Sequence, residues 1–99
     1  MFNAFSITTS FFAEFVHTDG GVTCSESGFI DLSTAQECSG SVNYAKSFNS
    51  KALYKKETSI SVFPKGCIIN KVSGLMYFNT HSTGGRLSYY RNICKNGNT

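Results

Sequence analysis

Four cysteines constrain this chain more than any other feature. They stand at Cys24, Cys38, Cys67 and Cys94, with 13, 28 and 26 residues between successive cysteines. An even number of cysteines in a short chain indicates a disulfide framework, and four cysteines allow three pairings. A zinc site would need ligands close together, as in C-x-x-C, and the sequence has no such pair. The cysteines therefore favour two disulfides over free thiols or a metal site, and the spacing leaves their pairing open.

Disulfides in turn predict an oxidising location. They persist outside the cell, in a lumen or in a virus particle, and are rare in the cytosol. The N-terminal segment has no basic start and is interrupted by polar residues, so it does not resemble a signal peptide. No stretch approaches the roughly 20 apolar residues of a membrane span. We expect an extracellular, lumenal or virion protein without a membrane span, either processed or made without a signal peptide.

The composition predicts one β-rich domain. A chain of 99 residues is long enough for a single domain of thin stability margin, in which each cross-link matters. Phe and Tyr occur 9 and 5 times against a single Pro, and only 15% of residues are charged. Aromatic residues suit a pleated, half-buried surface, and low charge argues against disorder.

The Phe-rich beginning of the chain predicts a strand or an arm. Between Phe5 and Phe15 apolar residues alternate with mostly polar ones, which is the period of a half-buried strand. Two interpretations stay open, because the segment can belong to the core or pair with the sheet edge of a neighbouring chain. We predict residues 1–15 as this strand or arm, residues 16–95 as the disulfide-stabilised domain, and residues 96–99 as a flexible tail.

The rest of the chain predicts one helix and several strands. The helix begins at Ser33 or Thr34, because a Gln or Glu three residues later completes a capping box. One helical stripe then contains Ala35, Cys38, Val42 and Ala45. Strands are predicted at Ser59–Phe63, Cys67–Ile69, Leu75–Phe78 and Tyr89–Cys94, with Asn70–Gly74 as a hairpin loop. The expected fold class is α+β, a small β-rich domain with one helix packed on an antiparallel sheet and two disulfides.

Charge is divided unevenly along the chain. Up to Ala45 there are five acidic residues and no basic one, and from Lys46 onward there are nine basic residues and one acid. Either the two halves interleave and neutralise each other locally, or an acidic and a basic face favour head-to-tail association. We expect no nucleic-acid partner, since Lys55-Lys56 is the only adjacent basic pair and no reading motif accompanies it.

The sequence predicts no catalytic site. His81-Ser82 lies in a polar loop and His17 beside an Asp-Gly turn, and each is typical of a structural histidine. Disulfides would remove the free thiolate that a cysteine nucleophile needs. No phosphate-binding, dinucleotide-binding or metal-binding motif occurs. We expect a protein that is not an enzyme and has neither cofactor nor metal.

Two binding functions remain. The first is a structural or assembly protein, such as a cement-like minor capsid subunit of a virion, whose partners are other protein subunits. The Phe-rich segment would contribute Phe2, Phe5, Phe11 and Phe12. The second is a secreted or surface recognition module for glycans, since aromatic rings stack on sugars and amides or guanidinium groups bond hydroxyls. Its candidate residues are Tyr77, Asn79, Arg86, Tyr89 and Tyr90.

Short motifs around the cysteines resemble a known family. They occupy Gly21–Cys24, Gly28–Cys38, Pro64–Cys67, Leu75–Asn79, Thr83-Gly84 and Ile93–Lys95. In this order they are similar to a functionally uncharacterised cysteine-rich domain of marine algae, related protists and the large DNA viruses that infect them. The resemblance covers roughly Phe12 to Lys95. It implies a disulfide domain and supplies no function to transfer.

The arrangement also resembles, more distantly, the PAN/apple layout. In that layout a helix bearing Glu-Cys lies over a sheet, and the outer cysteines stand near the two ends. The resemblance implies that Cys24 pairs with Cys94 and that Cys38 pairs with Cys67. The second pair agrees with the place of Cys38 on the helical stripe. This chain lacks the third cysteine pair of the apple pattern.

Overall fold

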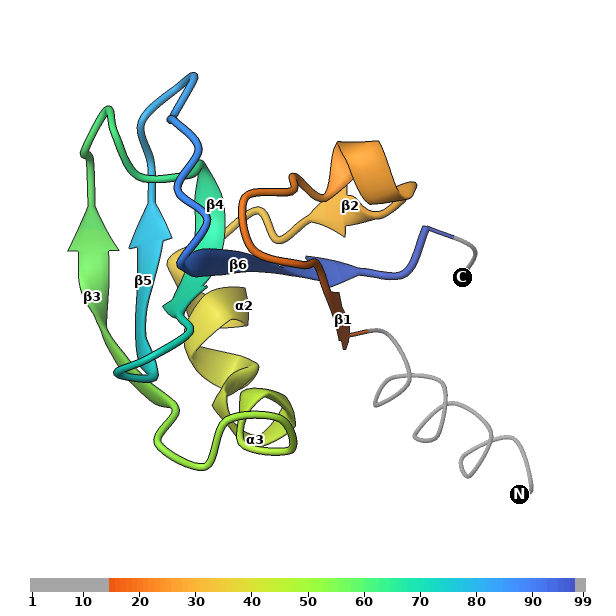
Figure 1. The fold of residues 1–99 in the computed structure, drawn as a ribbon, viewed down its shortest axis with the longest axis vertical. Coiled ribbons are helices and arrows are strands. Elements are labelled where there is room, and N and C mark those ends of the chain that lie inside the picture. The colour runs from red at the N-terminus through yellow and green to blue at the C-terminus, as the bar shows by residue number, and fades with distance from the viewer. Residues whose placement is uncertain (1–14, 98–99) are drawn as a thin grey trace.

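Six strands form one mixed sheet in the computed structural model, which describes residues 15–97 (Figure 1). The strand order is β1-β6-β4-β5-β3, and β2 also pairs with β6. In chain order the elements are β1 (Phe15–His17), the 3-10 helix η1 (Ser25–Ser27), β2 (Ile30–Asp31), α2 (Ala35–Gly40), α3 (Val42–Ala45), β3 (Leu53–Thr58), β4 (Gly66–Asn70), β5 (Leu75–Asn79) and β6 (Tyr90–Lys95). The predicted arm before Phe15 and the last two residues of the predicted tail lie outside the described residues.

The hairpin of β4 and β5 occupies the middle of the sheet and confirms the predicted one. Asn70 shapes its turn, because the side-chain oxygen accepts hydrogen bonds from the backbone N–H groups of Val72 and Ser73. Gly74 ends the turn with a φ of 77°. A Cβ at that position would lie 2.7 Å from the carbonyl carbon of Lys51. Glycine is therefore required there by both backbone conformation and space.

The final strand, predicted from the sequence and confirmed as β6, ties the early part of the described chain to the sheet. Its first half pairs with β4, and its second half has β1 and β2 as antiparallel neighbours. Val16 of β1 and Asp31 of β2 both have Cys94 as their partner in the register. β6 is consequently the strand that joins β1 and β2 to the rest of the sheet.

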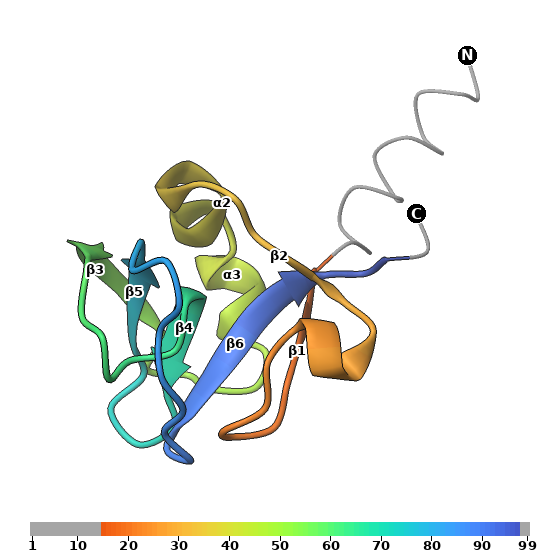
Figure 2. The same ribbon diagram turned by 90° about the horizontal axis from the view of Figure 1, so that it is seen from above.

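The core gathers buried side chains from both short helices and from the central strands. Ile69 of β4, Met76 of β5 and Ile93 of β6 are each 0% exposed. Ala45 of α3 belongs to the same cluster. Figure 2 shows α2 and α3 on one side of the strands.

Two disulfides are present, as predicted. One joins Cys24, at the start of η1, to Cys94 of β6, and the other joins Cys38 of α2 to Cys67 of β4. All four residues are 0% exposed. The pairing is the one that the PAN/apple resemblance implied, although a shared pairing does not establish family membership. Two disulfides are consistent with an oxidising, extracellular or lumenal environment.

The prediction of a single helix is wrong, because the segment forms two short helices. Thr34 caps the first as expected, since its hydroxyl accepts a hydrogen bond from the Glu37 backbone N–H. The Glu37 carboxylate in turn accepts one from the Ser33 backbone N–H. Ser41 separates α2 from α3, and its buried hydroxyl donates to the Cys38 carbonyl at 2.7 Å. Such a bond back to the preceding turn competes with regular helix geometry.

The sheet is mixed, so the expectation of an antiparallel sheet is wrong. β3 runs parallel to β5. The predicted strand at Ser59–Phe63 is also wrong, because these residues turn and the strand is the preceding segment, Leu53–Thr58. Asn79 explains the turn, since its side-chain amide binds the Ile60 and Phe63 carbonyls and holds this segment as a loop.

Charges from the two halves of the sequence meet in the fold. Each salt bridge of residues 15–97 joins an acid of the first half to a base of the second. The pairs are Glu26–Arg86, Asp19–Arg91 and Glu37–Lys95. For these three acids the first interpretation of the charge pattern therefore holds: the two halves of the sequence interleave and neutralise each other locally.

Candidate functional site

The tyrosines proposed for ligand binding lie together, and Phe63 connects them. Its ring centroid is 6.2 Å from that of Tyr77 and 4.9 Å from that of Tyr90, and Tyr89 lies 5.4 Å from Tyr90. Tyr89 is 45% exposed, whereas Tyr90 is only 6% exposed. The sequence did not single out Phe63, since its place depends on how the loop after β3 folds.

Asn79, a candidate for bonding sugar hydroxyls, is buried and only 1% exposed. Its side-chain nitrogen donates to the carbonyls of Ile60, Phe63 and Pro64, at 2.9, 3.0 and 2.9 Å. Its side-chain oxygen accepts from the Ile60 backbone N–H at 2.9 Å. The amide is thus used inside the protein, where it holds the loop between β3 and β4.

Arg86, the charged candidate of the glycan hypothesis, is exposed but bound to Glu26. One guanidinium nitrogen donates to a Glu26 carboxylate oxygen at 2.9 Å, and a second nitrogen donates to the other oxygen. Arg86 also donates to the Gly21 carbonyl at 3.2 Å. These bonds hold the pKa of Glu26 at about 2, well below its ordinary value. The pair joins η1 to the loop before β6.

The two histidines are engaged in local structure. The ring of His17 stacks on Phe48 with centroids 3.8 Å apart, and its Nδ1 lies 2.7 Å from the Tyr44 hydroxyl. The Nδ1 of His81 accepts a hydrogen bond from the Gly84 backbone N–H at 3.1 Å. Among the described residues no three His, Cys, Asp or Glu side chains are grouped so that they could hold a metal ion. Phe2, Phe5, Phe11 and Phe12 lie outside the described residues.

Acidification is expected to destabilise the fold through His17. Burial, and to a lesser extent Arg91, lower the pKa of this histidine from 6.5, against a smaller opposing effect of Asp19. The unfolded chain therefore binds a proton first, so the stabilisation is complete above pH 6.5 and is lost as pH falls through 6.5 towards the lower folded-state pKa. The melting temperature, followed by circular dichroism, should fall over this range. The His17→Phe variant keeps a ring on Phe48 but cannot titrate, so its melting temperature should fall less; an equal fall in both proteins would contradict the assignment.

An open sheet edge is the feature that the sequence did not reveal. β3 is the last strand of the sheet, and Figure 1 shows it at the rim. The Leu53 N–H donates to the Gly74 carbonyl, and the Thr58 carbonyl accepts from the Thr80 N–H, so these two residues turn their backbone groups towards β5 and its flanks. Because successive residues of a strand direct their backbone groups to opposite sides, Tyr54 and Glu57 face outward. By this alternation the backbone groups of both residues point away from β5, and within residues 15–97 no hydrogen bond from a turn, a loop or a side chain reaches them.

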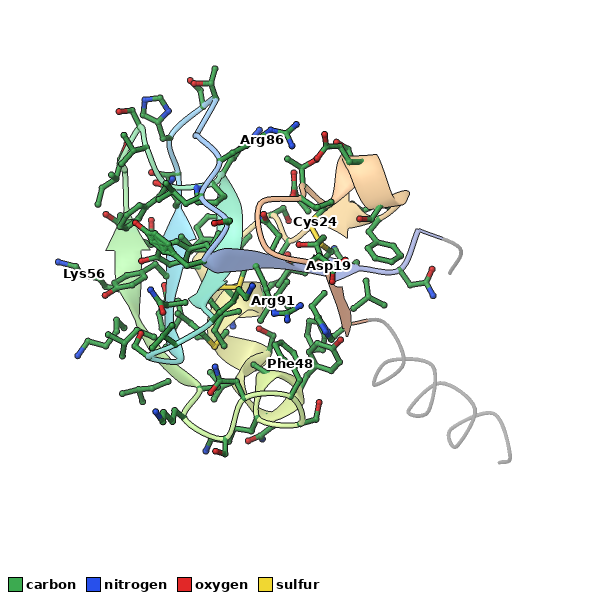
Figure 3. The ribbon with its side chains drawn as sticks, viewed as in Figure 1. Asp19, Cys24, Phe48, Lys56, Arg86 and Arg91 are labelled. Carbon is green, nitrogen blue, oxygen red and sulfur yellow. A yellow bond between two sulfur atoms is a disulfide. The ribbon has the colours of Figure 1, made fainter. Side chains whose placement is uncertain are left out.

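Exposed side chains accompany this edge. Leu53 at the start of β3 is 54% exposed, and Ile60 and Val62 just beyond its end are 37% and 59% exposed. Lys55 and Lys56 are exposed in the middle of the strand, where the register against β5 shifts. Figure 3 shows Lys56 projecting away from the sheet at this rim. We call Leu53–Thr58 with Ile60 and Val62 the β3 edge.

Two lysines of the β3 edge, Lys55 and Lys56, take no part in the salt bridges of the described chain. The salt bridges of the described chain use Arg86, Arg91 and Lys95. Six lysines take part in none of them: Lys46, Lys51, Lys55, Lys56, Lys65 and Lys71. Of the described acids, Asp31 and Glu57 stay outside salt bridges, and only Glu57 lies on β3. Lys55, Lys56 and Glu57 together give the β3 edge a net charge of 2 − 1 = +1, so the edge is basic.

Fold and site together define a small disulfide-stabilised β-rich domain with one open, basic sheet edge. No protein-family model, curated protein or solved structure matches the chain. None of the helices in residues 15–97 is long and apolar enough to cross a membrane.

Proposed function

We propose that this chain is a non-catalytic assembly module that docks on another protein by accepting a partner strand at the β3 edge. The observation that carries the proposal is the pair of outward-facing residues, Tyr54 and Glu57, whose backbone groups point away from β5 and have no turn, loop or side-chain hydrogen bond among the described residues. An unpaired edge is a template for strand addition, in which backbone hydrogen bonds give affinity and alternate side chains give specificity.

The energetics of the β3 edge suit docking of moderate strength. Two outward residues offer two N–H and two C=O groups, and a net hydrogen bond contributes about 1 kcal/mol. Contacts with Leu53, Ile60 and Val62 would add about 25 cal/mol for each Å² of apolar surface removed from water. These exposed apolar side chains lie at the two ends of the edge, where a partner strand longer than β3 would cover them.

The setting of such an assembly is a further part of the proposal. Two internal disulfides suit a subunit that works in an oxidising place. A virion is one such place, and in that setting the chain would be a minor, cement-like capsid subunit. Its partners would be the neighbouring protein subunits.

Strand addition can be tested without knowing the natural partner. The full-length oxidised protein is used to select peptides from a random displayed library, and the selected peptides are then measured against two variants. Glu57→Pro removes the outward N–H of β3 and leaves the residues bonded to β5 unchanged, so we expect binding to be lost. Glu57→Thr removes the same charge but keeps the N–H, so binding should persist. Peptides that bind wild type and both variants equally, or no selected peptide at all, would refute the proposal.

Glycan recognition is the second candidate, and the contact between Phe63 and the tyrosines supports it. Tyr77 and Phe63 are partly exposed neighbours, and Tyr89, which is 45% exposed, is linked to them through Tyr90, so exposed aromatic rings could stack on a saccharide. The burial of Asn79 and the engagement of Arg86 by Glu26 leave this surface without its predicted hydrogen-bonding groups. A glycan array that shows no binding by wild type above that of Tyr89→Ala would exclude this function.

A further inference from the structure

We infer that the partner strand accepted by the β3 edge is acidic and belongs to a different protein, not to a second copy of this chain. This inference rests on the proposed function and names its partner. It follows from three features of the edge: the order of its side chains, the register available to a second copy, and the charge of Lys55 and Lys56, which no salt bridge of the described residues uses.

The side chains of the β3 edge alternate in kind along its length. Leu53 is exposed at one end, Lys55 and Lys56 occupy the middle, and Ile60 and Val62 are exposed beyond the other end. A strand that pairs with this edge meets apolar, then basic, then apolar side chains. Opposite charges on facing positions stabilise a strand pair, and so do facing apolar residues. The complementary partner therefore has Asp or Glu in its middle and apolar residues towards its ends.

A second copy of β3 is a poor partner because of its charge. Full antiparallel overlap of two β3 strands places Leu53 opposite Thr58, and it therefore places Lys55 opposite Lys56 twice. Full parallel overlap places each lysine opposite the same lysine. Like charges directly opposite each other destabilise a strand pair. Lysines on an edge are also a common means by which proteins prevent self-association.

The shift of register within β3 also disfavours pairing with a second copy of this strand. In the register Tyr54 lies opposite Met76 and Lys56 lies opposite Tyr77, so the register advances by two residues on β3 for one on β5. A bulge of this kind bends its strand and increases the local twist. Two bulged edges do not form the flat, regular ladder that an identical pair would need, whereas an extended segment of another protein can adapt to one bulge.

The rest of the protein does not neutralise these lysines. The three acids in salt bridges are bound to Arg86, Arg91 and Lys95, which lie in β6 or in the loop before it. Glu57 is the single acid on β3. Docking of an acidic strand would supply the missing countercharge, and the attraction would weaken as salt screens it.

The peptide selection described above tests this inference when its products are analysed for charge. We expect the Glu57→Pro-sensitive peptides to be enriched in Asp and Glu at their centre. Affinity, measured by fluorescence anisotropy, should fall about tenfold for Lys55→Gln/Lys56→Gln, which corresponds to two cross-strand ion pairs. The control Lys46→Gln/Lys71→Gln makes the same change in net charge away from the edge and should leave affinity nearly unchanged. Raising salt from about 50 mM to about 500 mM should weaken wild-type binding more than binding by the Lys55/Lys56 variant.

The possible contrary results separate the inference from the function on which it rests. Edge-dependent peptides without acidic residues would overturn the acidic partner and leave strand addition intact. Equal loss in the two double-lysine variants would also overturn it, because net charge and not the edge would then govern binding. Self-association of the full chain in sedimentation velocity, abolished by Glu57→Pro but not by Glu57→Thr, would identify a second copy as the occupant. The absence of any edge-dependent peptide would refute the proposed function itself.

Discussion

Replacing Cys24 and Cys94 together by alanine is expected to lower the free energy of unfolding by about 4 kcal/mol, because their disulfide closes a long loop in the unfolded chain. The two residues are 70 positions apart. Both β1 and β2 pair with β6 at Cys94, so the same bond holds the early strands in place. Urea unfolding followed by circular dichroism measures the loss. This loss is a large fraction of the 5–15 kcal/mol typical of a domain, about a quarter or more.

The shorter disulfide provides the matched control. Cys38 and Cys67 are 29 positions apart, and in the chain-entropy model their replacement costs slightly less, about 3.5 kcal/mol. Both cysteine pairs are fully buried, so the two double variants remove similar side-chain contacts. If the variant of the shorter loop is clearly the less stable one, loop closure is not the main source of stabilisation, and the local link between Cys38 and Cys67 would be more important.

Replacing Asn79 by alanine is expected to lower the free energy of unfolding by about 3 kcal/mol, since buried backbone groups lose their partners. The amide binds three carbonyls and one N–H of the loop between β3 and β4. Asn79→Asp has nearly the same size but cannot donate, so its carboxylate would face three carbonyl oxygens. We expect Asn79→Asp to be at least as destabilising as Asn79→Ala at neutral pH, by thermal or urea unfolding.

Asn43 supplies the control for this prediction. It is exposed on α3, and Asn43→Ala should change stability by no more than about 0.5 kcal/mol. Losses of less than about 1 kcal/mol for both Asn79 variants would mean that water replaces the amide and that the loop does not depend on it.

The local parts of the fold could be predicted from the sequence. The hairpin of β4 and β5 has apolar strands around a Gly-containing turn, and the cap at Thr34 has its Glu three residues later. In both cases the interacting residues are close in sequence, so the pattern contains the contacts that form. The break at Ser41 was not predictable in this way, because a hydroxyl that bends a helix and one that faces solvent give the same pattern.

β3 was missed because an exposed edge strand carries little hydrophobic pattern. Its sequence, LYKKET, has two adjacent lysines and a bulge, so no apolar period appears. The neighbouring segment Ser59–Phe63 alternates well, yet it is a loop because the distant Asn79 binds its carbonyls. Parallel pairing of β3 with β5 is likewise a long-range contact, which a local pattern does not contain.

For the candidate site, too, the sequence shows which residues are present but not where the fold places them. The sequence identified tyrosines that do lie near one another, but it could not show that Tyr90 and Asn79 are buried. The uneven charge of the two halves was visible. The pairing of β6 with the N-terminal strands decides which acids form salt bridges, and the sequence does not show this pairing. It likewise does not show that the lysines of β3 stay outside the salt bridges.

Amide hydrogen exchange in the free, oxidised, full-length protein tests most directly whether the β3 edge is open. The amides of Tyr54 and Glu57 should exchange much faster than that of Leu53, whose N–H is bonded to the Gly74 carbonyl, and much faster than the buried amides of the β4–β5 hairpin. Nuclear magnetic resonance resolves these amides individually. Protection of Tyr54 and Glu57 equal to that of Leu53 would show that the edge is already covered, and docking of a partner strand on β3 would then be contradicted.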